Sequence, residues 1–156
     1  VAYTALFAAL ASVLMFFSVP LPLLRLGFQD KEEVYIVPLN FGYTESDGHL
    51  TLYFHSARQG RKIDLIARTH RAGFELDTDY ALHTGPMACD YSARFQSIIG
   101  TGTVAFVDGA AEKQAALRQI MLHNTGREDW TFSEAMLQAV CIFKLEVTSL
   151  SCKAHA

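Results

Sequence analysis

The chain has 156 residues, 51% of them hydrophobic, and a formal net charge of -3. That length and apolar content predict a single compact domain, residues 1–156, and leave too little chain for a second one. Because nucleic-acid affinity depends on a strongly basic face, the slight acidity argues against a nucleic-acid binder and requires any anion site to be local.

The first 22 residues form an apolar segment, and no Asp, Glu, Lys or Arg occurs before Arg25. Pro20 and Pro22 would interrupt a helix, so about 18 residues precede the break, near the lower limit of roughly 17 for a membrane-spanning helix. A signal peptide fits poorly, because a positively charged start and a small-residue cleavage site are both missing. We therefore expect a buried or interface-covering helix in residues 1–22, with a membrane anchor or an irregularity of the sequence as alternatives.

Two apolar, β-favouring runs, 23–28 and 34–41, are joined by charged residues and predict an antiparallel pair of strands. Pro38 lies inside the second run. Because proline donates no ladder hydrogen bond, it indicates an edge strand, a bulge or a place where the strand faces something other than a neighbouring strand. After a turn at Asp47 and Gly48, apolar and polar residues alternate over 50–55, which predicts a third strand.

The second half of the chain contains two glycines, Gly100 and Gly102, inside a predicted strand, where they indicate a bulge or a close backbone approach. About six strands with few helices predict a mainly β protein, in which an antiparallel sheet curls into a barrel. The predicted elements after the third strand are a helix at 60–68, a strand at 72–77, a loop at 78–92, a long strand at 95–108, a helix at 110–123, a short helix with Thr131 and Glu134 at capping-box spacing, and a strand at 140–147.

Positive charge is concentrated at the junction between the third strand and the first of these helices. Five cations stand there against one acid, Asp64: Arg58, Arg61, Lys62, Arg68 and Arg71. The first three fall at the start of the helix that follows Gly60, where free backbone N–H groups and the helix dipole favour an anion. Glycine at that position also lets the backbone approach a ligand closely. The pattern predicts a phosphate site, with a solvated basic helix face as the alternative.

The three cysteines, Cys89, Cys141 and Cys152, are odd in number, and their spacing matches neither a zinc ribbon nor a disulfide framework. We therefore expect a reducing, cytoplasmic location, with Cys141 as a small core residue of the last strand. The histidines show no ligand spacing, so no metal site is predicted.

Four segments resemble one known family, in the same order along the chain: YIVPLNFGY, LYFHSARQGRKIDLI, SIIGTGTVAFV and VCIFKLEV. They are similar to the pyridoxamine 5'-phosphate oxidase-related, FMN-binding split-barrel superfamily, in particular to its nitroimidazole-resistance (Nim-like) branch. The resemblance runs from about Arg25 to Lys153, and four collinear motifs are more specific than any one of them.

The resemblance implies an FMN-binding split β-barrel that forms a homodimer, with the flavin held between two subunits and with FAD or another flavin as alternatives. The flavin ring and ribityl chain would lie along Val37, Pro38, Leu39 and Asn40. The other cofactor contacts implied are His55, Ser56, Ala57, Gly60, Arg61, Lys62 and Ser97. Among these, Gly60, Arg61 and Lys62 match the phosphate-binding turn of the family.

His55 is the candidate catalytic residue. Its alternation with Phe54 places it on the face opposite the core, and in Nim-like proteins the matching histidine is near the substrate pocket. A histidine titrates in a useful range, although a hydrogen-bonded wall is an equal alternative.

The chain departs from the family at its carboxyl end. A true pyridoxamine phosphate oxidase carries a basic motif there for its substrate phosphate, whereas this chain ends TSLSCKAHA, which argues against vitamin B6 oxidation. Nim-like relatives usually have glycine before the lysine that matches Lys153, and this chain has Cys152 instead.

Two functions follow from the resemblance. The first is an FMN-dependent oxidoreductase that passes electrons from NAD(P)H to a nitroimidazole or another small aromatic acceptor, where the flavin supplies the chemistry. The alternative is a non-catalytic protein that binds a flavin, a deazaflavin or haem for storage or sensing. One barrel hosts several chemistries, so the fold alone does not choose between them.

Overall fold

The computed structural model describes residues 23–155, and the helical segment expected at 1–22 lies outside them. Its elements are β1 (Leu24–Asp30), β2 (Glu33–Leu39), β3 (Phe41–Ser46), β4 (His49–Ser56), α2 (Arg61–Thr69), β5 (Arg71–His83), the short helix η1 (Ala88–Asp90), β6 (Ser92–Val107), α3 (Ala110–Thr125), α4 (Glu134–Ala139) and β7 (Cys141–His155).

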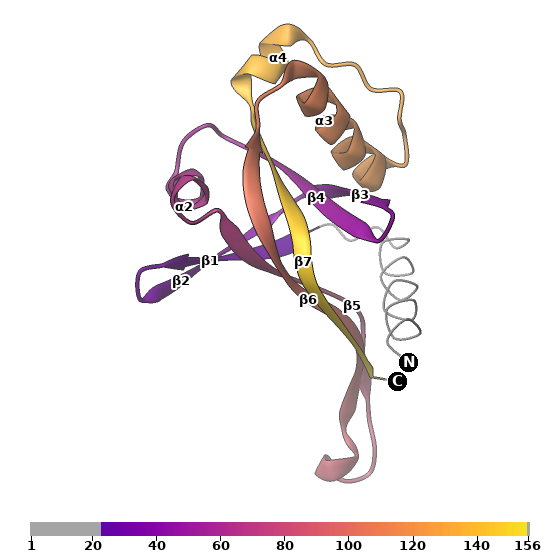
Figure 1. The fold of residues 1–156 in the computed structure, drawn as a ribbon. Helices are drawn as coiled ribbons and strands as arrows, with labels where there is room; N and C mark the ends of the chain where they lie inside the picture. The colour runs from indigo at the N-terminus through magenta and orange to yellow at the C-terminus, as the bar shows by residue number, and fades with distance from the viewer. Residues whose placement is uncertain (1–22, 156) are drawn as a thin grey trace.

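All seven strands belong to one antiparallel sheet in the order β2-β1-β5-β6-β7-β4-β3 (Figure 1). β2 and β3 are therefore the two edges of the sheet, yet Asn40 alone separates them along the chain. Consecutive Cα atoms are about 3.8 Å apart, so the sheet has to curl until its edges meet at this corner. No ladder joins β2 to β3 in the described part of the chain, and the seam beyond Asn40 stays open. The result is a split barrel, as predicted.

The core lies inside this curled sheet. β1 directs Leu24, Leu26 and Phe28 inward, and the rings of Phe54 and Phe143, from neighbouring strands, stack with centroids 5.1 Å apart. Alternate residues of β1 and β4 face away from the core, which is why period-two alternation located these strands in the sequence.

α3 packs on β3 through a glycine. A Cβ atom on Gly42 would overlap the backbone of Gln119 and Ile120 in α3. The helix ends at Gly126, whose φ of 71° is left-handed and whose N–H donates to the carbonyl of Leu122. Glycine at position 42 therefore sets how closely α3 approaches the barrel.

α2 is held against the hairpin of β1 and β2 by ion pairs. Arg61 donates from Nε to Asp30 Oδ2 at 2.8 Å and from Nη2 to Glu33 Oε2 at 3.0 Å, and Arg68 donates to Asp30 Oδ1 at 2.7 Å. The guanidinium of Arg61 also lies 4.9 Å from the ring centroid of Tyr35. The two arginines hold the pKa of the Asp30 carboxyl below its usual value, with the hydrogen bond from Arg68 as the largest cause.

Several predictions about individual elements are confirmed. Pro38 lies in an edge strand, opposite Arg25, and a register shift between Thr101 and Gly102 forms the predicted irregularity of the long strand.

The run at 34–41 divides at Asn40, so there are seven strands against about six expected. The short helix begins two residues later than predicted, because Ser133 and not Thr131 is the N-cap: its hydroxyl accepts from the N–H of Met136.

The loop predicted at 78–92 was wrong, because β5 continues to His83 and pairs with β6 from Ser92 onward. These residues form an arm, here defined as 79–94, that projects from the barrel (Figure 1). A bulge between Thr78 and Ala81 begins the arm, with Asp79 at a φ of 59°. β5 is exposed on both faces after Thr78, so the alternation that reveals a half-buried strand is absent.

Gly42→Ala should destabilise the protein by about 2 kcal/mol or more, because the added methyl meets helix backbone that cannot rotate away. Urea unfolding would measure the change. Gly109→Ala is the matched control, since a Cβ atom there meets nothing within 4 Å. Equal unfolding free energies for the two variants would contradict this account of α3 packing.

Asp30→Asn should destabilise the protein at pH 7 and have no effect in strong acid. A carboxyl whose pKa is depressed in the folded state stabilises that state above its ordinary pKa, about 3.9, and the stabilisation is lost as the pH falls through the depressed value. Thermal unfolding of both forms between pH 7 and pH 2 measures this, with Glu32→Gln in the same turn as control. A difference that persists at the lowest pH would show that the ion pairs are not its source.

Candidate functional site

The turn between β4 and α2 exposes a helix start with no side-chain cap. Gly60 stands at the N-cap with φ 127°, a conformation that glycine alone adopts readily. Its carbonyl accepts from the N–H groups of Ile63 at 2.9 Å and Asp64 at 3.2 Å. The N–H groups ahead of them have no partner within the helix, and they carry the positive end of its dipole.

A buried hydroxyl lies at the same end of β4. Ser56 is the last residue of β4 and pairs with Cys141 at the start of β7. Its Oγ is buried and has no hydrogen-bond partner among the described residues. Buried hydroxyls in proteins are almost always hydrogen-bonded, so this oxygen marks a place where a polar ligand would complete the structure.

Three cations and one acid, Asp108, act on the thiol of Cys141, the residue that pairs with Ser56. Cys141 is half-buried rather than in the core, and burial raises the pKa of its thiol, while Lys113, Arg58 and Lys62 act in the opposite direction. Within residues 23–155, the side chain of Lys62 has no ion pair and no hydrogen bond. Ser56, the Gly60 helix start and Lys62 together therefore offer three kinds of donor that lack an acceptor.

Three of the four arginines of the basic stretch have side-chain partners, contrary to the interpretation that Asp64 alone opposes them. Arg61 and Arg68 bind the acids of the β1–β2 hairpin, and Arg58 Nη1 donates to the carbonyl of Gln138 at 2.8 Å. Asp30 and Glu33 are about thirty residues away in the sequence, so a local charge count did not find them. The phosphate role of Arg61 stays a prediction and would require it to share its guanidinium with these acids.

The strand residues implied for the flavin lie next to the turn. Phe41 pairs with Phe54, so Asn40 lies one residue beyond that pair, at the end of β4 that carries His55. Val37 and Leu39 are half-buried against the core, whereas Pro38 and Asn40 are exposed. His55 and Ala57 are also exposed, and the corner at Asn40 brings the end of β2 beside His55.

Ser97 is not brought together with the others within one chain. It pairs with Asp77 and with Lys153, which lies twelve residues along β7 from the Cys141 that pairs with Ser56. At a strand rise of about 3.3 Å per residue, twelve residues correspond to roughly 40 Å. A contact from Ser97 to a ligand at the turn would have to come from another copy.

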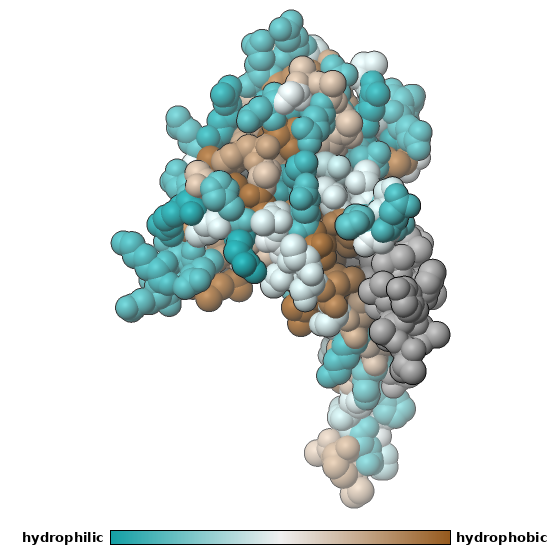
Figure 2. All heavy atoms as spheres, viewed as in Figure 1, coloured by the Kyte–Doolittle hydropathy of each residue, from teal (hydrophilic) through white to brown (hydrophobic). Residues whose placement is uncertain are grey.

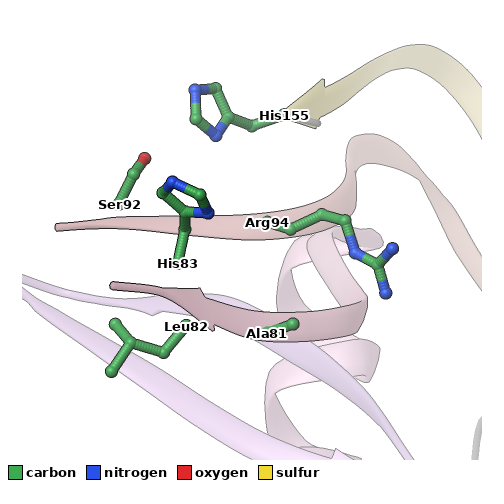
Figure 3. Close-up of a pocket in the computed structure, with 6 residues that line it drawn as sticks. All are labelled: Ala81, Leu82, His83, Ser92, Arg94 and His155. Atoms are coloured by element: carbon green, nitrogen blue, oxygen red, sulfur yellow. The ribbon is translucent and has the colours of Figure 1, made fainter. Parts of the chain in front are cut away.

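A hollow of about 580 Å³ lies in the arm, and Arg94 of its lining is three residues from Ser97 (Figure 3). Its lining is Ala81, Leu82, His83, Ser92, Arg94 and His155. Arg94 is paired with Asp79 at 2.9 Å, and His155 Nδ1 donates to the carbonyl of Ala93 at 2.8 Å. Two of its polar side chains are thus already engaged by the arm itself.

The described side chains include no group of three His, Cys, Asp or Glu residues arranged to hold a metal ion. Within 23–155, every helix is too short or too polar to cross a bilayer.

Known structures share this fold. A candidate 5-nitroimidazole antibiotic resistance protein from Bacteroides thetaiotaomicron is 32% identical, with 85% of this chain and 76% of that chain covered and a TM-score of 0.73. The flavocytochrome Anf3 from Azotobacter vinelandii is 18% identical, with coverage of 94% and 67% and a TM-score of 0.76. A FAD-binding protein from Mycobacterium smegmatis is 19% identical, with coverage of 94% of each chain and a TM-score of 0.61. The last two likenesses show the fold alone.

Among curated proteins, none matches the chain. The family model described as pyridoxamine 5'-phosphate oxidase matches residues 20–154, which is most of the sequence. Together with the 32% identity to the Bacteroides protein, this match confirms the resemblance that the four motifs indicated. The chain belongs to the pyridoxamine 5'-phosphate oxidase-related family.

Proposed function

We propose that the chain is an FMN-dependent oxidoreductase that takes electrons from NAD(P)H and passes them to a small aromatic acceptor such as a nitroimidazole. The observation that carries the proposal is the set of unsatisfied donors at one turn: the buried Ser56 hydroxyl, the uncapped helix start at Gly60 and the Lys62 ammonium. A phosphate monoester provides the acceptors that these donors lack, because its oxygens are charged and helix starts bind such groups.

The remaining candidates fit a flavin that extends from the phosphate along the open seam. Val37, Pro38, Leu39 and Asn40 would line the ring and ribityl chain with backbone and apolar surface, and Asn40 adds an exposed amide. His55 and Ala57 are the exposed residues at the end of β4 and just beyond it. A bound flavin supplies the hydride transfer. His55 would hold or donate a proton to the acceptor beside it.

The relatives support this assignment in different degrees. The protein that is 32% identical is described as a candidate in 5-nitroimidazole antibiotic resistance, which favours a nitroaromatic acceptor. The more distant structures are described as a flavocytochrome and as a FAD-binding protein, which favours a flavin of some kind. We choose FMN among the flavins because it ends in a phosphate monoester, and the unsatisfied donors of the turn lie around one place, beside Ser56.

Binding of a flavin without turnover is the second candidate. The distant relatives favour it, because they are described as a flavocytochrome and as a FAD-binding protein. Binding alone also places no catalytic demand on His55. Reduction by a nicotinamide donor separates the two candidates, since a storage protein has no need to accept electrons from NADPH. For both functions we propose a cytoplasmic location, which the three free cysteines support.

We also propose that the protein works as a homodimer with flavin between the subunits. Ser97 lies too far from the turn to reach a flavin held by its own chain, so a second copy would have to bring it there. The sheet carries exposed apolar residues near Ser97 on β6 and also on the edge strand β2, namely Ile99 at 57%, Val34 at 72% and Ile36 at 61% exposure. Figure 2 shows apolar surface gathered at the middle of the molecule, whereas the tip of the β1–β2 hairpin is hydrophilic. Exposed apolar patches of this kind mark protein interfaces.

The purified protein should take up FMN, show oxidised-flavin absorption and lose that absorption on addition of NADPH. Lys62→Gln should weaken FMN binding about tenfold or more, because a charge-assisted hydrogen bond contributes roughly 1.5–3 kcal/mol. Riboflavin, which lacks the phosphate, should bind the wild type and this variant equally, as measured by fluorescence titration. Lys31→Gln, with the same charge change in the β1–β2 turn, is the control.

If the protein took up no FMN, the turn would be an ordinary basic surface and not a phosphate site. Uptake without bleaching by NADH or NADPH would favour the storage candidate. If Lys62→Gln weakened riboflavin and FMN alike, the lysine would not be a phosphate ligand.

Ile99→Asp should convert the dimer to a monomer and reduce flavin binding with it. The side chain is exposed in the single chain, so the charge should disturb an interface and leave the monomer folded. Sedimentation velocity measures the mass, and Met136→Asp, an exposed apolar residue on α4, is the control. A wild-type monomer that binds flavin fully would contradict the two-copy site.

A further inference from the structure

α4 is attached to the rest of the protein by few contacts. Leu137 is its only buried side chain, and the segment before it, 127–133, has no regular structure. At its carboxyl end, two cations hold two successive carbonyl groups. Arg58 Nη1 donates to Gln138 at 2.8 Å, and Lys113 Nζ, from the first turn of α3, donates to Leu137 at 3.4 Å. A helix end has free carbonyls of this kind, and cations satisfy them well.

One of these cations, Arg58, also adjoins the candidate phosphate turn along the chain. Arg58 is two residues from Gly60, and Cys141, two residues after the end of α4, pairs with Ser56. Arg58, Lys62 and Lys113 all act on the Cys141 thiol. The end of α4 and an anion at Ser56 would therefore draw on the same guanidinium.

We propose that α4 is a latch over the anion site: Arg58 leaves the carbonyl of Gln138 for a bound phosphate, and the carboxyl end of α4 is then released. The inference rests on the proposed phosphate site and adds a regulation of that site. Guanidinium is charged in both bonds, but a phosphate oxygen carries negative charge whereas a carbonyl oxygen does not, and guanidinium matches phosphate in two-point geometry. A carbonyl is the weaker acceptor, so the exchange favours the phosphate.

Release of α4 changes access to the turn. Lys113 belongs to α3, which stays packed on β3, so the lysine that donates to Leu137 stays in place and the helix can dock on it again when the anion leaves. The latch therefore closes the empty turn and opens it as the phosphate arrives. By linkage, anything that holds α4 down weakens phosphate binding by the same factor.

Hydrogen exchange of the full chain, followed by mass spectrometry, tests the latch with inorganic phosphate and with FMN. The peptide that covers α4 should exchange roughly threefold faster or more at saturating phosphate, because opening this helix no longer breaks the Arg58 bond. Arg58→Gln should exchange at the fast rate without any ligand. Arg127→Gln, whose arginine pairs with Asp129 away from the turn, should behave like the wild type.

Unchanged or slower exchange of α4 at saturating phosphate would overturn the latch, as would wild-type exchange in Arg58→Gln. Phosphorus NMR shows whether phosphate is bound, and flavin absorption shows whether FMN is. If phosphate releases α4 and FMN does not bind, the latch stands and the proposed function falls. If FMN binds and α4 is undisturbed, the function stands and the latch falls.

Discussion

Asn40 connects β2 to β3, the two strands that lie furthest apart in the sheet order. A single linking residue cannot span an open seven-stranded sheet, so the sheet curls and its two edges meet. This closure encloses the aromatic core, places Phe41 opposite Phe54 and brings the end of β2 beside His55. The proposed flavin groove follows from the same constraint, because the edges touch at the corner and separate beyond it.

Charge within the site is divided between two kinds of cation. The β1–β2 hairpin engages Arg61 and Arg68 through Asp30 and Glu33, and α4 engages Arg58. Lys62 is left as a compact, strongly hydrated point charge next to a helix start. Guanidinium groups suit fixed two-point contacts, whereas an ammonium on a flexible stem adjusts to its ligand. Before a ligand binds, the arginines thus hold contacts within the protein, and the lysine is the cation available to bind first.

The sequence was sufficient for the fold class and for the family, and less so for contacts between distant segments. Alternation in β1 and β4 located these strands because one face of each is buried. The helix after Gly60 was found from its spacing and its glycine. The acids that pair with Arg61 could not be found, since no local pattern links a hairpin turn to a helix thirty residues later. The arm was missed because a ribbon exposed on both faces carries no hydrophobic period, and Ser97 could be matched to the family but not placed relative to the turn.

The arm and the barrel differ in how easily their backbone hydrogen bonds open. A two-stranded ribbon without a packed face is marginally stable in water, and residues 79–83 have no buried side chain. The barrel, in contrast, can open only by separating strands that share one aromatic core. Amides of the arm should therefore exchange by small local openings while those of β1 and β4 await global unfolding. A protease limited to such local openings would cut the arm first and leave the closed sheet intact.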